Sequence, residues 1–234
     1  MSALTQLGLL GGMSWQSTAL YYRRLNELVQ SRVGGHASAP LLIWSADFAE
    51  IEALQRAGEW PAQGRILAAA AARLDAAGVG AIALATNTLH LVSDDIAAAI
   101  EAPFIDLIDV VAKAVSGYRS VGILATDYTM TSDLYPKRLA QYGVDVIVPD
   151  EEDRRLVHSA IYDELLHGVI RDETRQAYLA VIDRLADRGA EAVLLACTEI
   201  GMLLVDGDAR VPLADTTILH CDALADVIIN GVRS

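Results

Sequence analysis

The triplet Cys197-Thr198-Glu199 holds the residue best suited to proton chemistry in this sequence. It directly follows the apolar run 192–196, so we expect the thiol at the end of a strand and the start of a helix. A helix N-terminus lowers the pKa of a thiol and makes the reactive thiolate available. The alternative is a buried structural cysteine, which the polar residues Thr198 and Glu199 disfavour.

The triplet Thr86-Asn87-Thr88 has the same position after the apolar run 81–85. Small polar residues at a strand-to-helix turn cap the helix and leave backbone N–H groups free, and such donors suit a carboxylate. Plain helix capping is the competing interpretation, and for Thr88 taken alone it is the preferred one.

Other polar and glycine features are less specific. Gly11 and Gly12 follow the first apolar run and would let the backbone approach a ligand closely, but they form neither a GxGxxG nor a P-loop pattern. We interpret Trp15 as a core residue. His90 and His220 could lie near a ligand cleft, although we interpret both as surface or capping residues.

The residue types that are missing exclude several cofactors. The only lysines are Lys113 and Lys137, both in helical patterns away from strand ends. A pyridoxal phosphate enzyme needs a Schiff-base lysine in its pocket, so we predict no such cofactor. There is no HExxH motif and no cysteine–histidine cluster, so we predict no metal site.

The composition points to a globular protein. Of 234 residues, 53% are hydrophobic and 21% charged, and the net charge of −13 makes nucleic acid a poor partner. No apolar run is long enough to span a bilayer, and residues 1–15 do not look like a signal peptide. Two cysteines without a CxxC pair predict a reducing, cytoplasmic setting, and we interpret Cys221 as structural.

Apolar runs of strand length alternate with helix-length segments, which predicts an α/β fold with parallel sheets. The expected strands are 7–10, 41–45, 81–85, 104–105, 121–124, 144–148, 192–196 and 211–213. The expected helices include 14–30, 61–77, 131–142 and 174–188.

The two halves of the chain resemble each other. Arg73-Leu74, Gly78 and Thr86 recur 111 residues later as Arg184-Leu185, Gly189 and Cys197, and 7–10 resembles 121–124. One match could come from shared composition, but several in order indicate a duplicated αβ domain. Ligands bind beyond the carboxyl ends of parallel strands. Two copies related by a pseudo-twofold axis would therefore bring Thr86 and Cys197 to opposite faces of one ligand in the cleft between them.

Taken together, these motifs resemble the aspartate/glutamate racemases. The resemblance rests on GLLGGMSW at 8–15, Thr-Asn-Thr at 86–88, Cys-Thr-Glu at 197–199 and Val-Pro-Leu-Ala-Asp at 211–215. It implies a cofactor-independent, homodimeric enzyme with one domain formed by 1–114 and 215–234 and another by 115–214. It also implies acid/base residues Thr86 and Cys197, and substrate contacts from Met13, Gln55, Asn87, Thr88, Thr198 and Glu199.

Three departures from the family pattern concern the acid/base pair and the substrate contacts. Most members carry cysteine at both acid/base positions, whereas this chain has Thr86, as does a branch specific for L-aspartate and L-glutamate. Leu166 occupies the position at which some aspartate racemases have a substrate-binding lysine. There is also no clear match near 47–55 for the arginine that some members place on the side-chain carboxylate.

The expected activity is racemisation of L-aspartate or L-glutamate, with proton removal and return at the α-carbon. Cys197 and Thr86 would act on opposite faces. One alternative is a single-cysteine decarboxylase or isomerase of the same superfamily, resembling the arylmalonate decarboxylases. Another is a catalytically weak amino-acid-binding protein.

Overall fold

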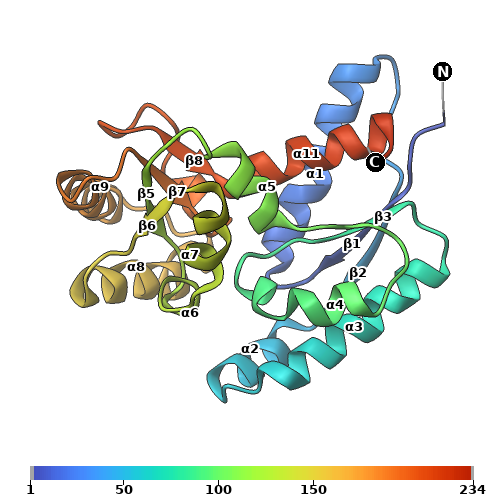
Figure 1. The fold of residues 1–234 in the computed structure, drawn as a ribbon, viewed down its shortest axis with the longest axis horizontal. Coiled ribbons are helices and arrows are strands. Elements are labelled where there is room, and N and C mark those ends of the chain that lie inside the picture. Colours follow the sequence, from blue (N-terminus) through green and yellow to red (C-terminus); the bar gives the residue numbers. More distant parts are fainter. Residues whose placement is uncertain (1–2, 233–234) are drawn as a thin grey trace. The chain divides into compact units, whose positions relative to one another are not determined.

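The computed structural model describes residues 3–232 and contains two compact units (Figure 1). The first unit extends to Leu107 and resumes at His220, and the second runs from Ile108 to Leu219. The chain therefore passes between the units twice, at 107–108 and at 219–220. The sequence prediction placed these passages after 114 and 214.

The first unit is built on a four-stranded parallel sheet with the strand order β2-β1-β3-β4. Its strands are β1 (Leu7–Gly11), β2 (Leu41–Ser45), β3 (Ala81–Leu84) and β4 (Phe104–Ile105). Its helices are α1 (Trp15–Val33), α2 (Phe48–Arg56), α3 (Trp60–Ala76), the 3-10 helix η1 (Thr88–Val92), α4 (Ser93–Ala98) and most of α11 (Thr216–Asn230).

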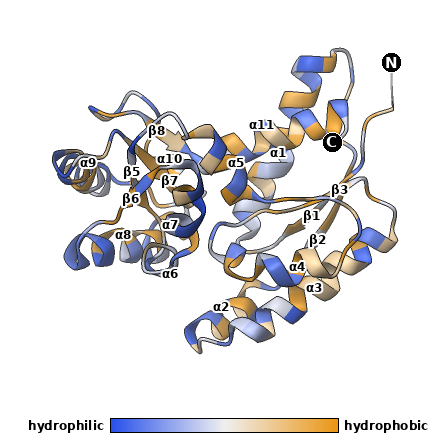
Figure 2. Ribbon diagram, in the orientation of Figure 1, coloured by the Kyte–Doolittle hydropathy of each residue, from blue (hydrophilic) through white to orange (hydrophobic). Residues whose placement is uncertain are grey.

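Alternating side chains on β1 and β3 build a core on each face of this sheet. Helices α1 and α11 cover one face, where the buried cluster includes Leu7, Leu9, Ala83, Tyr21, Leu25 and Leu224. Helices α2, α3 and α4 cover the other, where the cluster includes Leu10, Leu84, Ile51, Leu67 and Ile96. Figure 2 shows the hydrophobic residues along the strands between these layers. Burial on both faces explains why all residues of β3 are apolar.

The second unit has its own four-stranded parallel sheet, in the order β6-β5-β7-β8. Its strands are β5 (Ser120–Leu124), β6 (Asp145–Ile147), β7 (Ala192–Leu195) and β8 (Leu213–Asp215). Its helical elements are α5 (Leu107–Ala114), α6 (Asp127–Met130), α7 (Leu134–Leu139), η2 (Ala140–Tyr142), α8 (Glu151–Asp163), η3 (Leu165–His167), α9 (Asp172–Asp187) and α10 (Ile200–Leu203). Within residues 3–232, no helix is long and apolar enough to cross a membrane.

The sequence repeat has a packing cause that is the same in both units. A Cβ added at Gly8 of β1 would lie 3.3 Å from Cβ of Leu74, and one added at Gly122 of β5 would lie 3.3 Å from Cβ of Leu185. The repeated glycine and leucine are therefore neighbours in each unit, where the glycine lets a helix pack closely on the central strand. The two sheets also share one strand order, which confirms the predicted duplicated α/β fold.

Two predicted elements differ from the structure. The single helix expected over 131–142 is wrong, because α7 begins only at Leu134. Pro136 explains this start, since proline is tolerated in the first turn of a helix and disrupts its interior. Strand β8 covers 213–215 rather than 211–213 and ends on Asp215.

Candidate functional site

Cys197 lies just beyond the carboxyl end of β7. The N–H of Ala196 donates to the carbonyl of Leu124 at 2.8 Å, so the pairing of β5 with β7 continues to the residue before the cysteine. The Cys197 thiol donates to Oε2 of Glu199 at 3.1 Å, and the Thr198 hydroxyl donates to the same oxygen at 2.6 Å. A carboxylate that accepts two hydrogen bonds thus lies beside the thiol, and Glu199 is buried.

These surroundings raise the pKa of Cys197 well above its ordinary value. Burial of the sulfur contributes most, followed by the negative charge of Glu199 and the hydrogen bond that its carboxylate accepts. Asp215 adds to the increase, whereas the backbone N–H of Glu199 acts in the opposite direction. The sequence prediction of a lowered pKa is therefore wrong. The following helix, α10, is a single turn, and burial together with the two carboxylates outweighs its N-terminus.

Asp215 is held firmly at the carboxyl end of β8. Its Oδ1 accepts from the N–H groups of Thr217 at 2.8 Å and Ile218 at 3.1 Å, which caps the start of α11. A Cβ added at Gly201 would lie 2.3 Å from Oδ2 of Asp215. The carboxylate therefore packs directly against the α10 backbone, close enough for its charge to act on Cys197.

Tyr178 is a neighbour of this site that no sequence pattern singled out. It is fully buried in α9, and its hydroxyl donates to the carbonyl of Val157 in α8 at 2.8 Å. Burial raises its pKa well above the ordinary value, and the charges of Cys197 and Glu164 add to the effect. Tyr178 therefore stays protonated and links α9 to α8 near the cysteine. Its partner is 21 residues away in the chain, so local spacing carries no signal for it.

Thr86 has the equivalent place in the first unit, two residues beyond the end of β3. The N–H of Ala85 donates to the carbonyl of Leu10 at 2.8 Å, as Ala196 does in the second unit. Thr86 is partly exposed, whereas Asn87 and Thr88 are buried. The N-cap of the following helix is Asn87, whose side chain makes no capping hydrogen bond. Thr88 is the first residue of this helix, and its capping role stays a prediction.

His90 and His220 are both buried in the first unit, so their interpretation as surface residues is wrong. Burial lowers the pKa of His220 to about 3, and His90 acts in the same direction. The hydrogen bond to the Ile105 carbonyl and the charge of Asp106 oppose this decrease. His220 is therefore neutral at physiological pH.

The glycines of the β1–α1 turn are required by packing. Gly12 has φ of +89°, and a Cβ there would lie 2.3 Å from the backbone nitrogen of Ala46. A Cβ at Gly11 would lie 2.6 Å from Oγ1 of Thr18, the atom that accepts the N–H of Gly12 at 2.7 Å. Protein neighbours thus account for both glycines without the close ligand approach that the sequence suggested.

Three other residues of the first unit have clear positions. Met13 is buried in the cluster that contains Ile51, and Gln55 is buried on α2, so their proposed contacts with substrate stay predictions. Trp15 is 67% exposed, so its interpretation as a core residue is wrong. It begins α1, where Ser17 and Tyr21 face inward instead. Cys221 is buried in the core, as expected of a structural cysteine.

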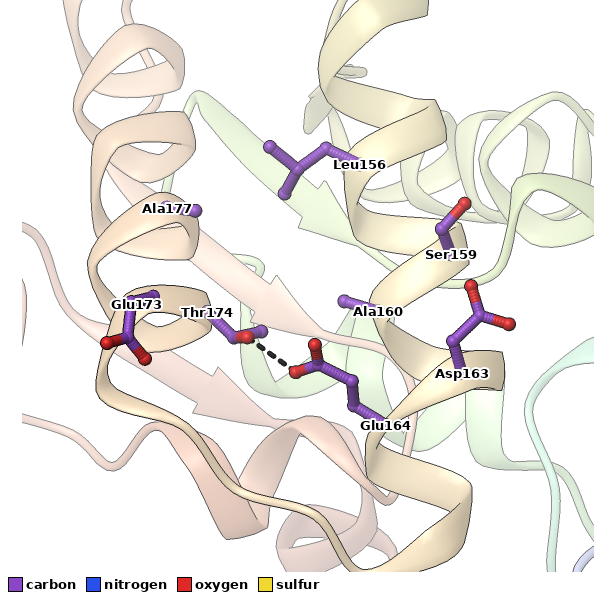
Figure 3. Close-up of a pocket in the computed structure, with 8 residues that line it drawn as sticks. All are labelled: Leu156, Ser159, Ala160, Asp163, Glu164, Glu173, Thr174 and Ala177. Atoms are coloured by element: carbon purple, nitrogen blue, oxygen red, sulfur yellow. Dashed lines mark hydrogen bonds between the residues drawn. The ribbon is translucent and has the colours of Figure 1, made fainter.

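A hollow of about 380 Å³ lies between α8 and α9 of the second unit (Figure 3). Thr174 donates to Glu164 at 2.5 Å, and Asp163 and Glu173 add further carboxylates. None of the predicted site residues lines this hollow, and its negative charge would repel an acidic amino acid.

Residues 3–232 contain no group of three or more His, Cys, Asp and Glu side chains arranged to hold a metal ion. Both lysines are exposed on helices, Lys113 on α5 and Lys137 on α7.

The sequence matches a known protein family over most of its length. A model of the family described as Asp/Glu/hydantoin racemase matches residues 10–224. The chain belongs to this family. Its fold is similar to that of a candidate Asp/Glu racemase from Yersinia pestis, with 42% identity, a TM-score of 0.90, and coverage of 96% of this chain and 99% of that one.

The chain is also similar to two further proteins, to different degrees. An aspartate racemase homologue from Pyrococcus horikoshii is 32% identical, with a TM-score of 0.84 and coverage of 96% of this chain and 99% of that one. The broad specificity amino-acid racemase RacX of Bacillus subtilis is 24% identical over 151 residues, which cover 63% of this chain and 64% of RacX.

Proposed function

We propose that this protein is a cofactor-independent racemase that interconverts the enantiomers of aspartate or glutamate. The observation that carries the proposal is the placement of two proton-bearing side chains, Thr86 and Cys197, at equivalent strand ends of two sheets with the same strand order. Racemisation needs one acid/base group on each face of the α-carbon, and a duplicated fold is suited to supply such a pair. Membership of the racemase family and the similarity to amino-acid racemases support the same reaction.

The α-carboxylate of the substrate is assigned to backbone N–H groups that follow the two acid/base residues. These belong to Asn87 and Thr88 in one unit and to Thr198 and Glu199 in the other. The enolate-like intermediate carries more negative charge on this carboxylate than the substrate does. Donors held there by the fold therefore stabilise the transition state more than the ground state.

The raised pKa of Cys197 suggests how the substrate itself activates the thiol. Burial keeps the thiol protonated, and Glu199 and Asp215 add to this because their negative charges disfavour the thiolate. The α-ammonium group of an amino acid placed against these carboxylates offsets their charge and lowers the cost of forming the thiolate. The thiol then loses its proton to solvent as the substrate binds, so the reactive form appears when the substrate is present.

The reaction then needs one proton transfer on each face. The Cys197 thiolate takes the α-proton of the L-enantiomer and becomes a neutral thiol, while the electron pair delocalises into the carboxylate. The Thr86 hydroxyl delivers a proton to the opposite face, directly or through a water, and regains a proton from solvent. Solvent also removes the proton now on Cys197, so the net change is inversion alone.

Threonine limits this cycle because its alkoxide lies far outside the range of side chains that titrate near neutrality. The enantiomers have equal free energy in water, so kcat/KM must be the same in both directions. A weak group on one face therefore slows both directions equally. It still allows Cys197 to exchange the α-proton of the L-enantiomer more often than the molecule inverts.

Replacing Thr86 with cysteine should raise the rate of inversion by about tenfold, since a thiol is a far better acid/base than a hydroxyl. Chiral chromatography of L- and D-aspartate and of L- and D-glutamate measures this rate. Thr86→Val is the matched control, because it keeps the branched shape and removes the hydroxyl, and it should lower inversion. A folded Thr86→Cys protein without any gain would argue against Thr86 as the limiting group.

The same chromatographic assay tests the proposed function against its alternatives. Appearance of D-aspartate or D-glutamate from the L-enantiomer supports racemisation. Loss of CO₂ from a disubstituted malonate, with no amino acid inverted, would favour a single-cysteine decarboxylase. Calorimetric binding of L-aspartate without turnover would favour a binding protein.

A further inference from the structure

The ring of His90 is fixed in one tautomer by two backbone groups of the first unit. Its Nδ1 is 2.8 Å from the carbonyl oxygen of Thr86, and its Nε2 is 3.1 Å from the backbone nitrogen of Leu107. A carbonyl accepts hydrogen bonds and a backbone N–H donates them. Nδ1 therefore carries the proton and donates to Thr86, while Nε2 accepts from Leu107.

His220 is fixed by the same reasoning in the other tautomer. Its Nε2 is 3.0 Å from the carbonyl oxygen of Ile105, so Nε2 carries the proton. Its Nδ1 then accepts from the Tyr21 hydroxyl at 2.9 Å. The centroids of the His90 and His220 rings are 6.5 Å apart, in an edge-to-face arrangement. The two rings thus form a neutral pair in which every ring nitrogen is used.

This pair is attached to both points at which the chain leaves or re-enters the first unit. Leu107, which donates to His90, is the last residue before the first passage, and His220 is the first residue after the second. His90 is also bonded to the carbonyl of Thr86. One side chain therefore joins the turn that carries Thr86 to the start of an inter-unit connection.

The bond to the Thr86 carbonyl has a geometric consequence for the substrate site. The carbonyl of Thr86 and the N–H of Asn87 belong to one planar peptide unit, and in the trans form they point in opposite directions. By holding this carbonyl, His90 turns the Asn87 N–H away from the buried ring. It also fixes the backbone from which the Thr86 side chain extends.

In the turn after Cys197, the corresponding carbonyl accepts from the backbone N–H of Ile200 at 3.1 Å. The residue 111 positions after His90 is Gly201, where a Cβ would lie 2.3 Å from Oδ2 of Asp215. A side chain cannot occupy that position, so the carboxylate of Asp215 fills the corresponding space. The two acid/base turns thus differ in their support: the His90 ring holds the Thr86 carbonyl, and a backbone N–H holds the Cys197 carbonyl.

We propose that His90 is a positioning residue that orients Thr86 and the Asn87 N–H for proton return. This inference rests on the proposed function, because it assigns Thr86 to one face of the substrate. In this role His90 acts through the Thr86 carbonyl and has no contact with the substrate. Loss of the bond to Thr86 should therefore impair inversion more than exchange of the α-proton, which takes place at Cys197.

Two substitutions separate the two bonds of the ring. In His90→Asn the amide nitrogen can take the place of Nδ1 and still donate to the Thr86 carbonyl. In His90→Gln the longer side chain reaches the place of Nε2, where its oxygen can accept from Leu107, and the bond to Thr86 is lost. His36→Gln, at an exposed histidine of the same unit, is the control.

The measurement is the ratio of inversion to α-proton exchange with L-aspartate and L-glutamate in deuterated buffer. His90→Gln should lower inversion by about 10²-fold, the cost of misplacing a reacting group by about 1 Å, and should lower exchange much less. His90→Asn should keep the ratio near that of the unchanged protein. Equal losses of both rates in His90→Gln, or a ratio that falls equally in both variants, would overturn the proposal.

A second measurement requires no substitution. ¹⁵N NMR of the imidazole nitrogens should show His90 as the Nδ1–H tautomer and His220 as the Nε2–H tautomer. An Nε2–H tautomer at His90 would contradict the proposed bond to Thr86. If the unchanged protein neither exchanges nor inverts either amino acid, the proposed function fails. If the protein is active but the ratio of inversion to exchange is the same with and without His90, only the role of His90 fails.

Discussion

Replacement of Cys197 by alanine is expected to slow α-proton exchange of L-aspartate or L-glutamate by about 10²–10⁴-fold, the usual contribution of a positioned acid or base. The thiol is the one group assigned to the L-face of the α-carbon, and alanine can neither take nor return a proton. Inversion should be lost with it, because both faces are needed for each turnover. Cys197→Ser should be nearly as inactive, since a hydroxyl is a much weaker base than a thiolate.

Cys221 provides the matched control for this substitution. It is buried in the core between the first sheet and helix α11 and takes no part in the proposed chemistry. Cys221→Ala should retain exchange and inversion, although the small cavity that it creates should lower the melting temperature. Exchange that survives in a folded Cys197→Ala protein would remove the thiol from the mechanism.

Replacement of Glu199 by glutamine is expected to shift the alkylation of Cys197 by iodoacetamide to lower pH. Alkylation follows the thiolate population, and the Glu199 charge and hydrogen bond raise the pKa of this thiol. In the unchanged protein the alkylation rate should therefore still be rising at pH values above the ordinary pKa of a thiol. Glutamine removes the charge, so the thiolate forms at lower pH and the profile moves in the acid direction.

The same substitution should weaken substrate binding although it makes the free thiol more reactive. The α-ammonium group loses a charged partner, which corresponds to a rise in KM of about 10–100-fold for a hydrogen bond to a charged group. Glu164→Gln is the control, because Glu164 lies in the same unit and acts on Tyr178. An alkylation profile that stays in place or moves to higher pH would refute the assigned effect of Glu199.

The duplicated fold could be predicted from the sequence because the same packing constraint recurs in both units. A Cβ at Gly8 or Gly122 would crowd the side chains around the central strand, and Leu74 and Leu185 are among the residues that it would meet. These constraints place the same residue types at a nearly constant spacing in the two halves of the sequence. Thr86 and Cys197 could be placed at strand ends for the same reason, since each follows a strand that is buried on both faces.

The pKa of Cys197 and the burial of the two histidines could not be predicted from the sequence. The pKa of Cys197 depends on Asp215, which is 18 residues away in the chain and is brought near by the pairing of β7 with β8. The burial of His90 and His220 depends on α11 packing against the first sheet, a contact between the two ends of the chain. Short spacing carries no information on such contacts, which is why both histidines looked like surface residues.

The most direct test of the account follows L-aspartate and L-glutamate in deuterated buffer with two simultaneous readouts. NMR measures loss of the α-proton, and chiral chromatography measures formation of the D-enantiomer. We expect Cys197-dependent exchange that is faster than inversion, because the weak Thr86 hydroxyl delivers a proton to the opposite face less often than Cys197 exchanges its proton with solvent. Equal rates of exchange and inversion would contradict Thr86 as the limiting group, and the absence of exchange with both amino acids would contradict the assigned racemase activity.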